Sequence, residues 1–195
     1  RDFMKNKLNG HDFIVIGIFN AIGIVIYMAV AFAFATTIIG GFIASGASFM
    51  VVATVYILMA MKVKKKGVFT ISGCLLGLIA LSGGHLPHAV FAVIGGIICD
   101  FIIGDYSSKV RIICGYGAFA LADFLVTVIP VLLFGKVSFV ERAKKWKMSE
   151  TQINATLSYF KFSWAVIFGI VTFILACIGA FIATKILKKH FEKAG

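Results

Sequence analysis

Two of the four histidines in this sequence lie close together, in the segment Ser82-Gly83-Gly84-His85-Leu86-Pro87-His88. A neutral imidazole can coordinate a metal or hydrogen-bond a ligand. The segment interrupts an apolar stretch from residue 68 to residue 104, where polar groups are tolerated mainly beside protein or a water-filled cavity. His85 and His88 are therefore candidate ligand-binding residues. The alternative is that both imidazoles only cap helix ends at the lipid headgroups.

No Asp, Glu or Cys stands near the two histidines to complete a metal site. We therefore expect no dedicated metal-ion site, although His85 or His88 could serve as an axial ligand to a haem iron.

Further polar residues lie inside apolar segments, where such groups are costly and often functional. Asn20 and Asp123 are both candidates for substrate binding. Asp123 could pair with Lys161 or with a histidine if the fold brings them together. Asp100 and Asp105 stand near Lys109 and Arg111 at the end of another apolar segment, which predicts an interfacial salt link there.

Aromatic residues gather where the last apolar segment begins, and they include Tyr159 and Trp164 on either side of Lys161. Such residues commonly form the aromatic belt at a membrane interface. They could also line a pocket for a flat ligand, with Lys161 meeting an anionic group on it.

The elements that position these residues are apolar helices, since 61% of the 195 residues are hydrophobic and 20 are phenylalanine. This composition predicts an all-α polytopic membrane protein that forms a single domain. We expect six transmembrane helices near 13–37, 41–61, 68–83, 87–104, 112–134 and 162–187. The net charge of +11 does not indicate a nucleic-acid partner, because the basic residues stand at the ends of the apolar segments.

Positive charges predict the orientation of the six helices, because cytoplasmic segments are rich in Lys and Arg. A cytoplasmic N-terminus places 13 of the 19 basic residues inside: Arg1, Lys5, Lys7, Lys62, Lys64, Lys65, Lys66, Lys109, Arg111, Lys185, Lys188, Lys189 and Lys193. Both termini are therefore expected in the cytoplasm.

The long external loop at 135–161 is expected to be a structured cap. Apolar residues from Phe139 to Trp146 recur at helical spacing among basic ones, as in an amphipathic helix at a membrane interface. Ser149 and Gln152 then form a capping-box pattern that predicts a further helical turn.

Two small residues four apart, Gly17 and Ala21, lie in the first apolar segment. This spacing lets helices approach closely in lipid, which serves equally well for packing inside the bundle or for docking a partner. Motifs of the common hydrolase, metalloprotease and nucleotide-binding classes do not occur, so we do not expect an enzyme.

The sequence resembles a known family along essentially the whole chain. The resemblance rests on the six helices, the Gly17/Ala21 start, the Gly83-Gly84-His85-x-Pro87 turn and the basic tail. The chain is similar to the substrate-binding S components of energy-coupling factor (ECF) transporters, and among them to the Trep_Strep membrane proteins. It departs from the alanine-x-x-x-alanine form of the family by having Gly17.

The resemblance implies a high-affinity capture subunit in a bacterial cytoplasmic membrane. Such a subunit binds a micronutrient at its external face and docks on a transmembrane T component driven by two cytoplasmic ATPases. It implies that Gly17 and Ala21 form the docking contact and that His85 to His88, with the start of the last helix, form the pocket. Haem is the first expected cargo and a vitamin-like heterocycle the second, with no intrinsic cofactor.

Two other classes remain possible from the sequence. One is an intramembrane electron carrier or enzyme in which His85 and His88 hold a resident haem. The other is a structural membrane subunit without a ligand of its own.

Overall fold

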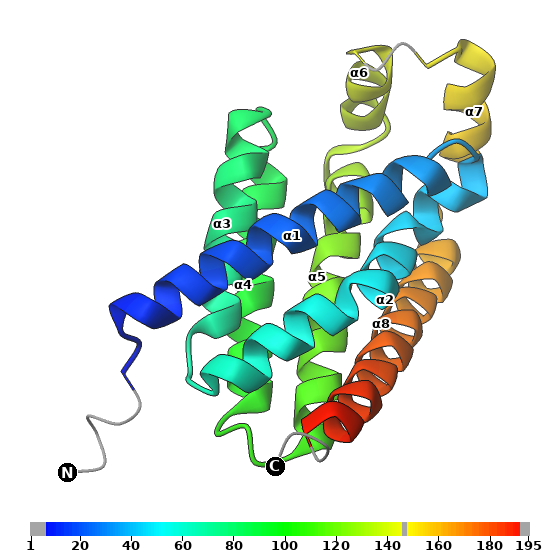
Figure 1. The fold of residues 1–195 in the computed structure, drawn as a ribbon. Helices are drawn as coiled ribbons and strands as arrows, with labels where there is room; N and C mark the ends of the chain where they lie inside the picture. The colour runs from blue at the N-terminus through cyan, green and yellow to red at the C-terminus, as the bar shows by residue number, and fades with distance from the viewer. Residues whose placement is uncertain (1–6, 146–147, 192–195) are drawn as a thin grey trace.

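The computed structural model describes residues 7–145 and 148–191, which form helices joined by short links (Figure 1). The helices are α1 (Gly10–Phe34), α2 (Ile38–Val63), α3 (Val68–Ser82), α4 (Leu86–Ile103), α5 (Lys109–Phe134), α6 (Val137–Lys145), α7 (Glu150–Ser158) and α8 (Phe162–Phe191).

Polar residues at the ends of the apolar runs decide where several helices begin. Asn9 and Asp12 form a capping box, in which the Asn9 side chain accepts from the Asp12 N–H at 2.9 Å and the Asp12 carboxylate accepts from the Asn9 N–H at 2.8 Å. The Thr37 hydroxyl oxygen caps α2 by accepting from the Gly40 N–H at 3.0 Å. Because these caps come before the first strongly apolar residues, α1 and α2 each begin three residues earlier than the hydropathy alone predicts.

Five helices, α1, α2, α4, α5 and α8, are long and apolar enough to cross a membrane. The sixth expected span corresponds to α3, which has only 15 residues where about 20 are normally needed. The chain is therefore an all-α polytopic membrane protein with about five candidate transmembrane helices, and the predicted count of six is not confirmed.

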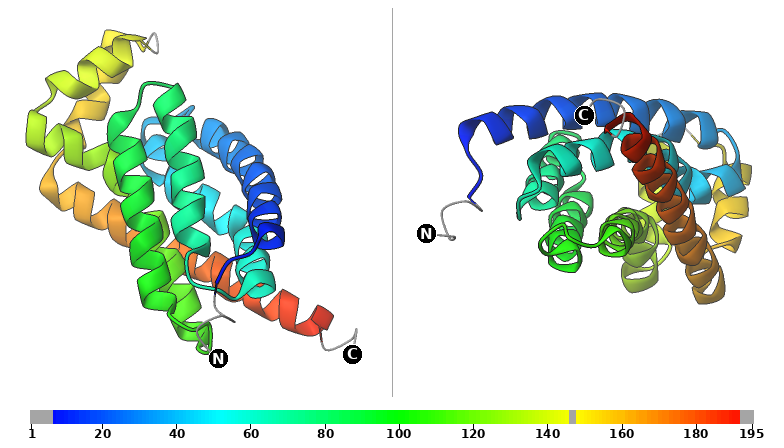
Figure 2. Two further views of the ribbon diagram at one scale, coloured as in Figure 1. Left: turned by 90° about the vertical axis from the view of Figure 1, so that its left-hand side faces the viewer. Right: turned by 60° about the horizontal axis from the view of Figure 1, so that its bottom comes forward.

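Glycines allow close approach between neighbouring helices. A Cβ atom at Gly73 of α3 would collide with the Ala92 carbonyl of α4, and one at Gly96 of α4 would collide with the Phe69 carbonyl of α3. These two helices form a tight hairpin beside α5 (Figures 1 and 2). In contrast, α1 lies across the outside of the bundle (Figure 2). Of the residues in an apolar 18-residue stretch of α1, 17% are buried, against 61% for the corresponding stretch of α2.

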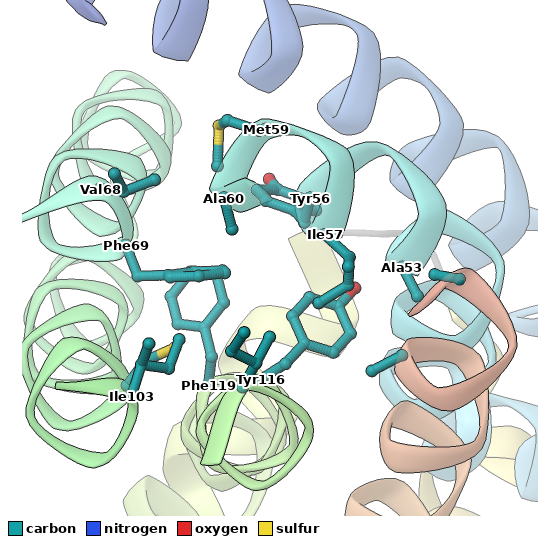
Figure 3. Close-up of a cluster of buried hydrophobic side chains, with 14 of the residues drawn as sticks. Ala53, Tyr56, Ile57, Met59, Ala60, Val68, Phe69, Ile103, Tyr116 and Phe119 are labelled. Atoms are coloured by element: carbon teal, nitrogen blue, oxygen red, sulfur yellow. The ribbon is translucent and has the colours of Figure 1, made fainter. Parts of the chain in front are cut away.

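The core lies between α2, α3, α4 and α5, where aromatic rings meet (Figure 3). The ring of Phe69 lies 5.7 Å from that of Phe119 and 6.3 Å from that of Tyr116, measured between centroids. The Tyr116 hydroxyl donates to the Phe49 carbonyl at 2.8 Å, which satisfies the one polar group of this buried ring.

Asp100 of α4 caps the beginning of α3. The N-cap residue of α3, Gly67, has no side chain to do this. The Asp100 carboxylate accepts instead from the N–H groups of Phe69 at 3.2 Å and Thr70 at 2.7 Å, and from the Thr70 hydroxyl at 2.7 Å. The predicted salt link is therefore wrong for Asp100, because the free N–H groups of α3 reach its carboxylate across the tight hairpin.

The other half of that prediction is confirmed, since Arg111 lies 3.4 Å from the Asp105 carboxylate. Hydrogen bonds from Ser107 lower the pKa of Asp105 to about 2, so this exposed carboxylate is charged at neutral pH.

Replacing Asp100 by alanine is expected to destabilise the protein by about 1–3 kcal/mol, because two N–H groups at the start of α3, one of them buried, lose their acceptor. Thermal unfolding of the detergent-solubilised protein measures the change. Asp105→Ala is the matched control and should leave the unfolding temperature unchanged, because Asp105 is exposed. Equal effects of the two substitutions would contradict the capping role of Asp100.

Candidate functional site

A largely buried carboxylate, Asp123 in the middle of α5, is the centre of a polar cluster that joins four helices. One oxygen, Oδ1, lies 3.0 Å from Nε2 of His88 in α4. The other, Oδ2, accepts from the Tyr27 hydroxyl of α1 and from the Ser45 hydroxyl of α2, each at 2.7 Å. We call Tyr27, Ser45, His88 and Asp123 the polar cluster.

The Asp123 side chain is only 12% exposed, so its charge requires compensation inside the bundle. Three donors supply this compensation, and each comes from a different helix. The carboxylate thus ties α1, α2 and α4 to α5.

The position of His88 follows from the α3–α4 turn. Gly84 takes a φ of 75°, which favours glycine, and the His85 N–H then donates back to the Ala80 carbonyl at 2.8 Å. Pro87 follows in the first turn of α4, as the sequence predicts. This sharp reversal places His88 at the start of α4, beside α5.

Tyr27 is held by α2 as well as by Asp123. Its ring packs edge-on against Phe49 with centroids 5.5 Å apart, and its carbonyl accepts from the Ser48 hydroxyl at 3.2 Å. The phenol therefore has a fixed direction toward Asp123.

A cavity of about 620 Å³ lies next to the polar cluster, and side chains of α6 and α7 form part of its lining. Its lining residues come from α1, the α1–α2 link, α2, α5, α6 and the segment 148–160, which contains α7. The lining consists of Tyr27, Met28, Ala31, Phe32, Ala35, Thr36, Thr37, Ile38, Gly41, Phe42, Ala44, Thr127, Phe139, Met148, Gln152, Thr156 and Phe160. Apolar walls with a few polar groups are typical of a small-molecule site.

The cap over this cavity has the helices that the sequence predicts. Amphipathic α6 contributes Phe139, and Ser149 caps α7 with both hydrogen bonds of the predicted capping box. Trp146, the last residue of the predicted amphipathic helix, lies outside the described residues.

A second hollow of about 300 Å³ lies on the outer face between α5 and α8, and its lining is apolar apart from the Cys177 thiol. It offers little to orient a polar ligand.

The structure brings two predicted site residues together, His88 and Asp123. Of the two partners considered for Asp123, it selects the histidine, while Lys161 is exposed at the start of α8. His85 is half-buried in the α3–α4 turn and is not part of the cavity lining described above.

Tyr159 and Trp164 lie behind the cavity wall. Their rings pack together with centroids 5.5 Å apart, and the Tyr159 ring lies 6.1 Å from that of Phe42, which does line the cavity. The adjacent Phe160 is the lining residue of this segment.

Asn20 belongs to a different part of the bundle. It is 1% exposed and donates to the Ser72 hydroxyl of α3 at 2.9 Å and to the Ile16 carbonyl at 2.8 Å. These bonds connect α1 to α3, and Asn20 is not part of the cavity lining.

Sequence reasoning missed Tyr27 and Ser45. The available signal was that each is a polar residue within an apolar helix. This signal is weak, because a hydroxyl group costs far less free energy to place in a membrane than a carboxylate does.

Gly17 and Ala21 lie on the outer side of α1. A Cβ atom at Gly17 would meet no other atom within 4 Å, and Ala21 is exposed. The two residues are thus accessible to a neighbour in the membrane.

Within residues 7–145 and 148–191, no three His, Cys, Asp or Glu side chains gather as a metal site would require.

A family profile described as "Hypothetical bacterial integral membrane protein (Trep_Strep)" matches residues 10–193. No curated protein and no solved structure matches the chain. The match confirms the family part of the resemblance, and it agrees with the apolar helices of the fold. The chain therefore belongs to the Trep_Strep family of hypothetical bacterial integral membrane proteins.

Proposed function

We propose that this protein is the substrate-capture subunit of a micronutrient importer, similar to the S components of ECF transporters. The observation that carries the proposal is the cavity of about 620 Å³ between the bundle and its helical cap. In this proposal the cap faces the outside of the bacterial cytoplasmic membrane, and both termini are cytoplasmic. The basic residues at the opposite end of the bundle support that orientation.

The proposed cargo is a flat molecule that packs among the aromatic and methionine side chains of the lining. A vitamin-like heterocycle fits best. Haem is the alternative, and it has less support because His88 already contacts Asp123 and neither His85 nor His88 belongs to the described lining.

The proposed partners are a transmembrane T component and two cytoplasmic ATPases, which would hydrolyse ATP while this chain does not act as an enzyme. The open outer face of α1 at Gly17 and Ala21 supports docking there, since the close-packed glycines of α3 and α4 are already used inside the bundle.

The test is a ligand screen on the purified full chain in lipid nanodiscs. Riboflavin, thiamine, pyridoxine and haemin are titrated separately by protein fluorescence, with absorbance added for haemin. Mass spectrometry identifies any small molecule that copurifies. We expect one flat heterocycle to bind with a Kd below about 1 µM, as a capture subunit requires. Absence of any bound or copurified small molecule would overturn the proposal.

A further inference from the structure

The hydrogen-bonding direction of Tyr27 determines what the inner end of the cavity can bind. A tyrosine hydroxyl has one hydrogen to donate. Tyr27 donates it to Asp123 Oδ2 at 2.7 Å, and Tyr27 also lines the cavity. Toward a ligand, its oxygen can therefore act only as an acceptor.

The charges behind Tyr27 reinforce this direction. Asp123 Oδ2 accepts from Tyr27, which lines the cavity, while Asp123 itself is not part of the described lining. His88 contacts the other oxygen and is not part of the described lining. Along this chain of contacts the carboxylate stands between His88 and Tyr27, so the negative partner of the pair is the one that contacts the cavity-lining residue.

Polar groups at the outer end of the cavity include hydrogen-bond donors. Thr37 Oγ1 accepts from the Gly40 N–H at 3.0 Å, which leaves its hydroxyl hydrogen to donate. Gln152 Oε1 accepts from the Ser149 N–H at 3.0 Å, which leaves the Gln152 amide N–H groups as donors. The Thr36 and Thr156 hydroxyls at this end donate to the Ala33 and Gln152 carbonyls, so the outer end offers both donors and acceptors, whereas the Tyr27 hydroxyl offers only an acceptor.

We propose that the inner end of the cavity binds the hydrogen-bond donor or cationic end of the substrate, through Tyr27 Oη and the charge of Asp123 behind it. The proposal rests on the proposed function and narrows the substrate class. The cargo is a heterocycle with N–H, O–H or cationic groups at its buried end. A carboxylate or phosphate does not enter first.

Charged thiol reagents test this without knowledge of the ligand. Thr127 lines the cavity and lies one helical turn from Asp123 on the same face of α5. Thr127→Cys is made in a chain whose accessible thiols are removed by Cys74→Ala, Cys114→Ala and Cys177→Ala. Its reaction rates with cationic trimethylammonioethyl and anionic sulfonatoethyl methanethiosulfonate are then compared. Each thiolate forms a mixed disulfide and releases methanesulfinate.

We expect the ratio of the cationic to the anionic reaction rate at Thr127→Cys to exceed the same ratio for a free thiol in solution by at least about fivefold. Thr36→Cys, at the outer end, should show a smaller preference. Asp123→Asn should lower the rate ratio at Thr127→Cys to the ratio measured at Thr36→Cys. Thr172→Ala is the control, because it removes a buried hydroxyl of α8 that is neither a partner of Asp123 nor part of the cavity lining.

An equal or reversed preference at Thr127→Cys would overturn the proposal, as would a preference that survives Asp123→Asn. If Asp123→Asn does not fold, the comparison of Thr127→Cys with Thr36→Cys decides in the same way. Failure of neutral methyl methanethiosulfonate to react at either position would show that the cavity is closed to solutes, which overturns the proposed function itself.

Discussion

Gly41→Phe is expected to weaken binding of the ligand found in the screen by at least about 100-fold, or roughly 2.7 kcal/mol. Gly41 lines the cavity, and a Cβ atom built there meets nothing within 4 Å. A phenyl ring at this position can therefore enter the cavity without displacing the backbone, and it occupies space that the ligand needs. Fluorescence titration of the purified variant measures the loss.

Gly17→Phe is the matched control, because it adds the same side chain at a glycine of α1 that also has open space around it. Gly17 lies outside the cavity lining, so ligand affinity should stay within about twofold of the unsubstituted protein. The same variant should lose copurification with a T component, since the bulky ring prevents close helix contact. Unchanged binding in Gly41→Phe would show that the ligand binds elsewhere, and retained copurification in Gly17→Phe would remove the docking assignment.

The second large effect is expected at Asp123. Asp123→Ala should destabilise the bundle by about 3–5 kcal/mol, because donors from Tyr27, Ser45 and His88 lose their acceptor in a poorly solvated interior. Asp123→Asn keeps an acceptor oxygen and should cost less. Unfolding of the detergent-solubilised variants by heat or by increasing SDS ranks them.

The control for this series is Thr127→Ala, on the same face of α5 but outside the polar cluster. It should have little effect on the unfolding temperature. A finding that Asp123→Ala is as stable as the unsubstituted protein would mean that the cluster does not hold the four helices together.

Hydropathy predicted the positions of the helices well because burial in lipid requires long apolar segments whatever the tertiary contacts. The expected start of the last span at residue 162 coincides with that of α8, and the expected span at 68–83 differs from α3 by one residue. Hydropathy alone does not decide whether the 15 residues of α3 cross a membrane, because the answer depends on how α3 pairs with α4.

The site was predictable only in part, because its residues come from helices far apart in the sequence. The cost of a carboxylate in an apolar helix indicated Asp123, and the turn indicated His88. Their contact depends on how α4 packs against α5, and this information is not local. Tyr27 lies 96 residues from Asp123 in the sequence, so no spacing pattern could connect the two.

The pairing of α3 with α4 has a consequence for how the protein is made. A nascent chain emerges from the ribosome in sequence order, so the beginning of α3 appears about thirty residues before Asp100, the residue that caps it. Until then, α3 is too short to span alone and its first N–H groups lack their native acceptor. The native capping of α3 can therefore form only after most of α4 has been synthesised.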